Sequence, residues 1–141
     1  MMHELFHRVE RPLGLMTEDG QNGHLDTLEG RYWQLLEWRA LARALATSGK
    51  ERTYAVQDAL TFRFARRQLF PAAAKNEVPE EIREGLAEYT ATVTTASSPQ
   101  DAAASAIQQL ADYAKRGSLV RDFAYASGTA WMRGLRVGPD S

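Results

Sequence analysis

The sequence contains no cysteine and no apolar run approaching the roughly 18 residues that a membrane-spanning helix requires. The missing cysteine excludes disulfides, thiolate metal ligands and cysteine nucleophiles, so any metal must be held by His, Asp or Glu. The net charge is only −1, which gives no general attraction to nucleic acid or to an acidic membrane surface. There is no secretory signal, so we expect a soluble protein, cytoplasmic by default unless a signal precedes this sequence. The oligomeric state stays open.

The composition is that of an ordinary globular domain, with 44% hydrophobic and 25% charged residues. The length of 141 residues predicts a single domain over residues 1–141. Apolar residues recur at helical spacing along most of the chain, which predicts an all-α fold of about five to six helices. The expected helices are 2–12, a long one ending at Ser48-Gly49, 51–69, one beginning at about Pro79, 99–115 and 118–135.

Local signals place some helix ends. Asp26 followed by Glu29 has capping-box spacing and predicts the start of the long helix. The segment 75–79 is expected to be a connector, and the β-branched run ATVTTASS at 91–98 is expected to fray or end the helix before it. Ser98-Pro99 predicts a cap with proline at the first helical position.

Residues 3–7 read HELFH, the spacing H-E-x-x-H. Residues four apart share a helix face, so His3 and His7 are placed to bind one zinc ion. Glu4 flanks that ion and is placed to act as general base toward a zinc-bound water. A catalytic zinc needs a third protein ligand and an open position for water. His24 does not fit the short spacing of a third histidine, so we expect a carboxylate from another helix. The alternative is an exposed N-terminal helix.

Residues 84–89 read EGLAEY, which resembles the E-G-[FL]-A-x-Y segment of gluzincin metallopeptidases, the aminopeptidase-N-like group above all. The resemblance implies that Glu84 is the third zinc ligand and that Gly85 lets two metal-bearing helices approach closely. By comparison with thermolysin-like relatives, it implies that Glu88 hydrogen-bonds a zinc-ligating histidine. The implied activity is zinc-dependent hydrolysis of a peptide or protein substrate. The alternative for Glu84 and Glu88 is a solvated helix face.

More diffusely, the chain resembles an uncharacterised group of bacterial proteins in which H-E-x-x-H, a helix rich in tryptophan and arginine, and E-G-L-A-E-Y follow one another. The implied fold is the helical part of a zincin catalytic domain without its N-terminal sheet. The gap between His7 and Glu84 is much longer than in the aminopeptidase-like set, so two extra helices must return the chain to the metal. The missing sheet and the position of the motif favour an N-terminally truncated member, a fragment of a longer protein.

Hydrolysis also needs a donor aimed at the developing oxyanion. Tyr125, in the segment FAYASG, is our candidate, with Tyr89 as a weaker one, and a core tyrosine as the alternative.

An arginine cluster in FRFARRQLF is either an anion contact or a solvated face paired with glutamates, and we favour the second: Arg63, Arg66 and Arg67. The three tryptophans are expected in the core: Trp33, Trp38 and Trp131. Nucleic-acid binding rests on the arginine cluster alone, and the near-zero net charge disfavours it. The alternative to a peptidase is a non-catalytic helical domain, or a degenerate metallopeptidase fragment, that acts as an interaction module.

Overall fold

The computed structural model describes Met2, Glu4, Leu5, Arg8 and residues 22–135. Between residues 22 and 135 the chain forms a short 3₁₀ helix and five α-helices: η1 (Gly23–Asp26), α2 (Leu28–Ala46), α3 (Gly49–Leu69), α4 (Ala73–Thr95), α5 (Pro99–Ala114) and α6 (Phe123–Gly134). These described residues contain no strand, so the predicted all-α class is confirmed. Most of the helix predicted over 2–12 lies outside the described residues.

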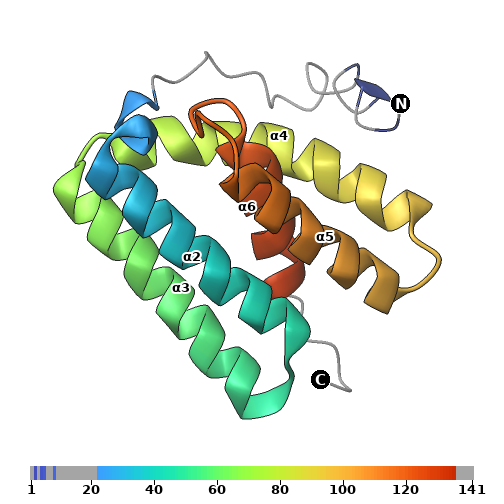
Figure 1. The fold of residues 1–141 in the computed structure, drawn as a ribbon. Coiled ribbons are helices and arrows are strands. Elements are labelled where there is room, and N and C mark those ends of the chain that lie inside the picture. Colours follow the sequence, from blue (N-terminus) through green and yellow to red (C-terminus); the bar gives the residue numbers. More distant parts are fainter. Residues whose placement is uncertain (1, 3, 6–7, 9–21, 136–141) are drawn as a thin grey trace.

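α2 and α3 form one closely packed pair and α4 and α6 form another, with α5 packed against α2 and α6 (Figure 1). α2 and α3 lie side by side as a helical hairpin, while α4 and α5 run on the other side of the molecule. α6 packs mainly on α4 and also touches α2 and α5, so it joins the two pairs. No helix among the described residues is long and apolar enough to cross a membrane.

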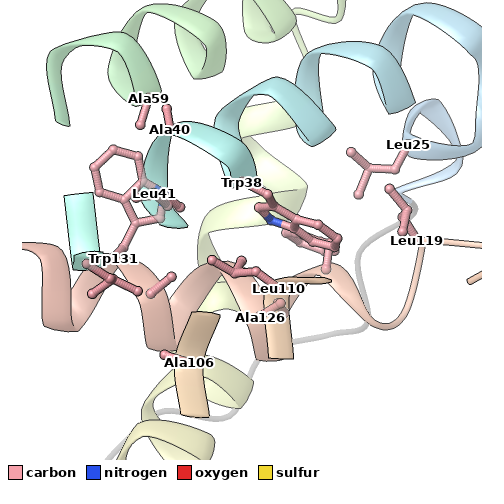
Figure 2. Close-up of a cluster of buried hydrophobic side chains, with 14 residues drawn as sticks. Leu25, Trp38, Ala40, Leu41, Ala59, Ala106, Leu110, Leu119, Ala126 and Trp131 are labelled. Atoms are coloured by element: carbon pink, nitrogen blue, oxygen red, sulfur yellow. The ribbon is translucent and has the colours of Figure 1, made fainter. Parts of the chain in front are cut away.

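The hydrophobic core lies where α2, α5 and α6 meet (Figure 2). Trp38 and Trp131 are its largest members, and Leu41 and Leu110 pack with them. Both indoles are buried, which leaves two N–H groups that need acceptors. Trp38 Nε1 donates to Ser127 Oγ at 2.6 Å, and Trp131 Nε1 donates to a carboxylate, described below. Two of the three predicted core tryptophans are therefore confirmed, and Trp33 is only half-buried.

The two predicted helix caps have different outcomes. Ser98 caps α5 as predicted, because its Oγ accepts from the backbone N–H of Asp101 at 3.0 Å. The predicted capping box at Asp26 is wrong: Thr27 caps α2, and its Oγ1 accepts from Gly30 N at 3.1 Å. Asp26 instead accepts hydrogen bonds from Leu119 N and from a serine hydroxyl in the segment before α6. The Asp26 side chain thus binds residues far along the chain and does not cap α2, as the local pattern predicted.

α4 is longer at both ends than the sequence predicted. It begins at Ala73, so the connector expected over 75–79 is helical and Pro79 lies inside the helix. Pro79 removes one backbone hydrogen bond, and burial of Ala73 and Glu77 holds the turns before it. The threonine-rich end stays helical to Thr95. Its hydroxyls are satisfied within the helix, as when Thr92 Oγ1 donates to the Glu88 carbonyl at 2.9 Å.

Most of the larger apolar side chains of α3 face outward: Tyr54, Leu60, Phe64 and Leu69 are all exposed. The buried positions of α3 are held instead by Ala55, Ala59 and Arg66. α3 therefore packs through small residues and a charged side chain, while Phe64 remains 65% exposed.

α4 and α6 cross at two glycines. A Cβ added to Gly85 would lie 2.5 Å from the Cα of Gly128, closer than real Cβ contacts allow. The backbones can therefore touch only because neither residue carries a side chain. Gly85 thus permits a close approach to α6. The close approach to the other metal-bearing helix, which the resemblance implied, stays a prediction, because His3 and His7 lie outside the described residues.

Candidate functional site

Four glutamates of α4 follow one another at spacings of four, three and four residues: Glu77, Glu81, Glu84 and Glu88. Such spacing places side chains along one stripe of a helix. The stripe faces different surroundings at its two ends. The first two glutamates meet arginines of α3. The last two meet side chains of α5 and α6, and Glu84 also pairs with an arginine of α4 itself.

Glu77 is fully buried and has three basic partners. Arg66, itself fully buried, donates to both of its oxygens, at 2.9 Å through Nε and 3.0 Å through Nη2. Arg67 Nε donates at 3.2 Å, and His24 Nε2 lies 2.7 Å from Oε1. Burial opposes the charged form of Glu77. The hydrogen bonds from His24 and Arg66 outweigh that effect and lower its pKa to about 2.

Glu37 of α2 and Arg63 of α3 extend this network. Arg63 donates to Glu37 at 2.7 Å and to Glu81 at 2.6 Å, and Trp131 Nε1 donates to Glu37 at 2.8 Å. Burial opposes the charged form of Glu37, but the guanidinium groups of Arg63 and Arg66 lower its pKa. For Glu81, burial dominates and raises the pKa, with Arg63 pulling the other way. We call these groups the charge network: Glu37, Glu77, Glu81, Arg63, Arg66 and Arg67.

The charge network corrects one prediction about the arginines. They pair with glutamates as expected, but the expected solvated face is wrong, since Arg66 is 0% exposed. With three carboxylates and three guanidinium groups, the network is balanced in charge. Its guanidinium groups take the place that a cation would otherwise fill, so it is a structural cluster. His24, which we did not expect to be a ligand, contributes to the same cluster.

Glu84 lies on the next turn of α4 and is also buried. Arg83 Nη2, on the same helix, is 3.3 Å from Glu84 Oε1 and is partly exposed. The hydroxyl of Tyr125 on α6 hydrogen-bonds the Glu84 carboxylate. Burial, the Glu84 charge and this hydrogen bond together raise the pKa of Tyr125 to about 12. Two residues that the sequence assigned to one site, 41 positions apart, are thus neighbours.

Tyr125 is held from its other side by an aromatic neighbour. Its ring stacks on Tyr113 of α5, with centroids 6.3 Å apart and an interplanar angle of 9°. Arg116 covers Tyr113, with its guanidinium carbon 4.2 Å from the ring centroid. Tyr125 is half-buried, so it combines a fixed ring with a hydroxyl directed at a carboxylate.

Glu88, one turn further along α4, is half-buried and accepts a hydrogen bond from Gln109 of α5. The distance from Gln109 Nε2 to Glu88 Oε1 is 2.9 Å. Glu88 also lines a hollow of about 680 Å³ between α4 and α5. Most of the hollow is lined by short side chains, among them Ala91 and Ser105.

The structure describes only some of the other predicted site residues. His3 and His7 lie outside the described residues, so their distances to Glu84 stay predictions. Glu4 is described and exposed. Within the described part of the chain, no three His, Cys, Asp or Glu side chains come together to hold a metal. The zinc set of His3, His7 and Glu84 therefore depends on residues beyond that part. Tyr89, the weaker tyrosine candidate, is half-buried on α4.

The sequence reasoning missed Tyr113 and Gln109. Both lie on α5, and the sequence motifs gave neither of them a role in the site. A signal was present: residues 109 and 113 are four apart and so share a face of α5. What the sequence could not show is that this face meets α4 and α6.

Comparisons with known proteins found no family model, curated protein or solved structure that matches this chain.

Proposed function

We propose that this chain is the metal-bearing helical part of a zinc-dependent hydrolase that cleaves peptide bonds. The observation that carries the proposal is the contrast along α4. Glu77 and Glu81 are paired with arginines of α3, whereas Glu84 lies beside the Tyr125 hydroxyl and the partly exposed Arg83, and Glu88 accepts a hydrogen bond from Gln109. The proposal therefore rests on Glu84, a buried carboxylate next to Tyr125 at the position that the motif assigns to a metal ligand. The sequence motifs at 3–7 and 84–89 make that cation zinc.

The donor set fits catalytic zinc in its chemistry. Two imidazoles and one carboxylate, from His3, His7 and Glu84, match the His₂Glu ligand set and leave one position open. Zinc bound there would acidify a water molecule and polarise the substrate carbonyl. Glu4 takes the proton from the attacking water and delivers it to the leaving amine.

The remaining residues orient these groups. The Tyr125 hydroxyl fixes the direction of the Glu84 carboxylate, while Tyr113 fixes the ring that carries the hydroxyl. Tyr125 is protonated at neutral pH, with its pKa raised to about 12, and its single O–H is directed at the Glu84 carboxylate. To serve a developing oxyanion, that O–H would turn from Glu84 to the substrate. Glu88 orients a ligating histidine.

The test begins with the zinc content of the purified chain and its hydrolysis of a peptide library. We expect one zinc per chain and activity in the unaltered protein. Glu4→Gln should retain zinc and lower kcat/KM by roughly 10²- to 10⁴-fold, the usual share of a general base. Glu84→Gln should lose zinc and activity together. Glu51→Gln, exposed on the first turn of α3, is the matched control and should change neither. A folded chain that takes up no zinc would contradict the proposal.

The second candidate is a non-catalytic interaction module. The exposed apolar side chains of α3, of which Phe64 is the most exposed, favour it because such residues often mark a binding surface. This candidate predicts a folded chain that is inert toward every peptide tested, and partner binding that is weakened by Phe64→Ser and not by Glu4→Gln. The peptidase proposal predicts instead that the chain hydrolyses peptides and that this activity is lowered by Glu4→Gln and not by Phe64→Ser.

A further inference from the structure

α2 turns one side away from its helical neighbours. It lies between α3 and α5 and also packs on α6 (Figure 1). Along the opposite side, residues follow one another at spacings of three or four, which keeps them on one face of the helix. We call this row the outer stripe: Leu28, Tyr32, Leu36, Arg39, Arg43 and Ala46. Leu36 is half-buried and the others are exposed, so the outer stripe is a helix face that the described part of the chain leaves uncovered.

The amino half of the outer stripe is apolar. Leu28 is 83% exposed and Tyr32 is 55% exposed. The ring of Trp33 meets the ring of Tyr32 edge-on, with centroids 5.3 Å apart, which limits the rotation of the tyrosine. Single exposed apolar side chains are common, but here three lie on successive turns of one helix face. They form a row that a second helix is able to cover.

The carboxyl half of the outer stripe is basic. Arg39 and Arg43 are exposed, and among the described residues neither guanidinium has a hydrogen-bond or ion-pair partner. Arg31, on the flank of the same helix, donates instead to the backbone carbonyls of Ala114 and Gly117, at 3.3 and 3.2 Å. The fold thus uses Arg31 and leaves the two arginines of the outer stripe available to another molecule.

No acidic side chain of α2 lies beside these two arginines. Glu29 lies at the amino end of α2, about 15 Å along the helix from Arg39. Glu37 is buried and paired with Arg63 of α3. The outer stripe therefore presents an apolar end and a positive end. A partner that complements it needs apolar side chains at one end and carboxylates at the other.

We propose that the outer stripe of α2 docks an amphipathic helix of a partner protein, acidic in its amino half and apolar in its carboxyl half, running antiparallel to α2. Spacings of three and four residues are those of a helix–helix contact. The antiparallel direction follows because carboxylates are most favourable in the first turns of a helix, and it places them opposite Arg39 and Arg43. A second copy of the chain fits less well: antiparallel stripes would set Arg43 against Leu28, and parallel stripes would set arginine against arginine.

The experiment titrates a fluorescently labelled synthetic peptide with the full chain and follows its anisotropy. The peptide is about 18 residues long, roughly five helical turns, with two glutamates in its amino half and two leucines in its carboxyl half at the spacings of the outer stripe. A second peptide carries glutamine in place of both glutamates. We expect saturable binding of the acidic peptide, weaker binding of its glutamine counterpart, and loss of that difference at high salt, which screens exposed charges.

Variants of the full chain locate the contact. Arg39→Gln combined with Arg43→Gln should weaken binding of the acidic peptide by roughly 2- to 20-fold, the usual range for two exposed ion pairs. Tyr32→Ser should weaken it by at least roughly 5-fold, because exposed aromatic anchors carry much of a docking energy. Arg39→Lys keeps the charge and should retain most of the binding. The matched controls are Arg121→Gln and Leu60→Ser, exposed on other parts of the chain, and both should bind as the unaltered chain does.

Several outcomes would overturn the proposal. One is an unaltered chain that gives no saturable binding of the acidic peptide up to about 1 mM. Equal binding of the two peptides, or equal losses in the stripe variants and the controls, would do the same. Binding to phosphatidylglycerol vesicles without binding to the peptide would assign the outer stripe to a lipid surface. Self-association abolished by the paired arginine substitutions would assign it to a second copy. None of these readouts involves zinc or peptide hydrolysis, so the proposal stands or fails separately from the proposed function.

Discussion

The two halves of α4 use the same residue type in opposite ways. In the amino half, Glu77 and Glu81 are enclosed by guanidinium groups from α3, and their charge is cancelled. In the carboxyl half, Glu84 lies beside the Tyr125 phenol and a partly exposed arginine of its own helix, Arg83, while Glu88 accepts a hydrogen bond from the Gln109 amide. A glutamate cancelled by arginine stabilises the fold, and one directed by neutral donors is suited to bind a cation. The predictions below test that division.

Arg66→Met should give the largest effect on stability. It leaves Glu37 and Glu77 buried with one basic partner fewer, and removing one member of a buried ion pair typically costs about 3–5 kcal/mol. Arg67→Met is the control, because Arg67 is partly exposed and makes a single hydrogen bond of 3.2 Å to the same glutamate. Urea unfolding of both variants checks the difference. Equal losses would show that burial of Arg66 does not matter.

Glu77→Gln and Glu88→Gln make the same change in each half. Glu77→Gln should lower the free energy of unfolding by roughly 1.5–3 kcal/mol at pH 7, since it weakens hydrogen bonds to charged groups. Glu88→Gln should cost less, about 1 kcal/mol or below, because it keeps an acceptor for Gln109 and removes no buried ion pair. A larger loss for Glu88→Gln than for Glu77→Gln would contradict the division of α4.

The effect of Glu77→Gln should also depend on pH in a defined direction. The pKa of Glu77 is lowered in the folded chain to about 2 from an ordinary 4.5. Its charge therefore stabilises the fold above pH 4.5, and that stability is lost as the pH falls toward 2. The difference between the unaltered chain and Glu77→Gln should shrink over this interval. Unfolding curves at several pH values measure it.

Gly85→Ala should separate α4 from α6, because the new Cβ would lie 2.5 Å from the Cα of Gly128. Overpacking of this kind typically costs about 1–3 kcal/mol. It should also displace Tyr125 from Glu84, so the raised pKa of that tyrosine should fall toward its ordinary value. Gly134→Ala is the control: its Cβ would meet nothing within 4 Å, and we expect little change.

Tyr125→Phe should lower the free energy of unfolding by about 1 kcal/mol, the usual net worth of one hydrogen bond. Tyr125 has its pKa raised to about 12, so its contribution is present at neutral pH and declines as the pH rises from 10 toward 12. In an absorbance titration, Tyr125→Phe should remove a tyrosine that ionises late. If the late step survives the substitution, it belongs to another tyrosine.

The sequence predicted best where the signal was local. The Ser98-Pro99 cap and the helix after it need only neighbouring residues, and they are present. The capping box at Asp26 failed because Leu119, far along the chain, supplies a competing donor. The start of α4 was missed because a proline normally opens a helix, whereas here burial of Ala73 and Glu77 extends the helix before Pro79. Long-range packing decided both cases.

The candidate site divides in the same way. The motif around Glu84 and the choice of Tyr125 came from the sequence, and the structure places the two side chains in contact. That contact does not test zinc binding, because His3 and His7 lie outside the described residues. The partners of Arg66 could not be read from spacing. A cluster of basic residues has the same pattern whether it faces solvent or a buried carboxylate on another helix.

α4 crosses α6 at Gly85 and Gly128, so any tilt between the two helices would be centred on this crossing, which lies at the candidate site. Glu84 is next to the crossing, and Tyr125 is one turn from it, about 4.5 Å along α6. Glu77 is two turns away, about 12 Å along α4. If α4 and α6 tilted by about 10° relative to each other about this crossing, the Glu77 turn would shift by about 2 Å. The Tyr125 turn would shift by less than about 1 Å. The salt bridges of Glu77 thus oppose a tilt at a turn where the displacement would be large. Glu84 and Tyr125 meet close to the crossing, where the displacement would be small.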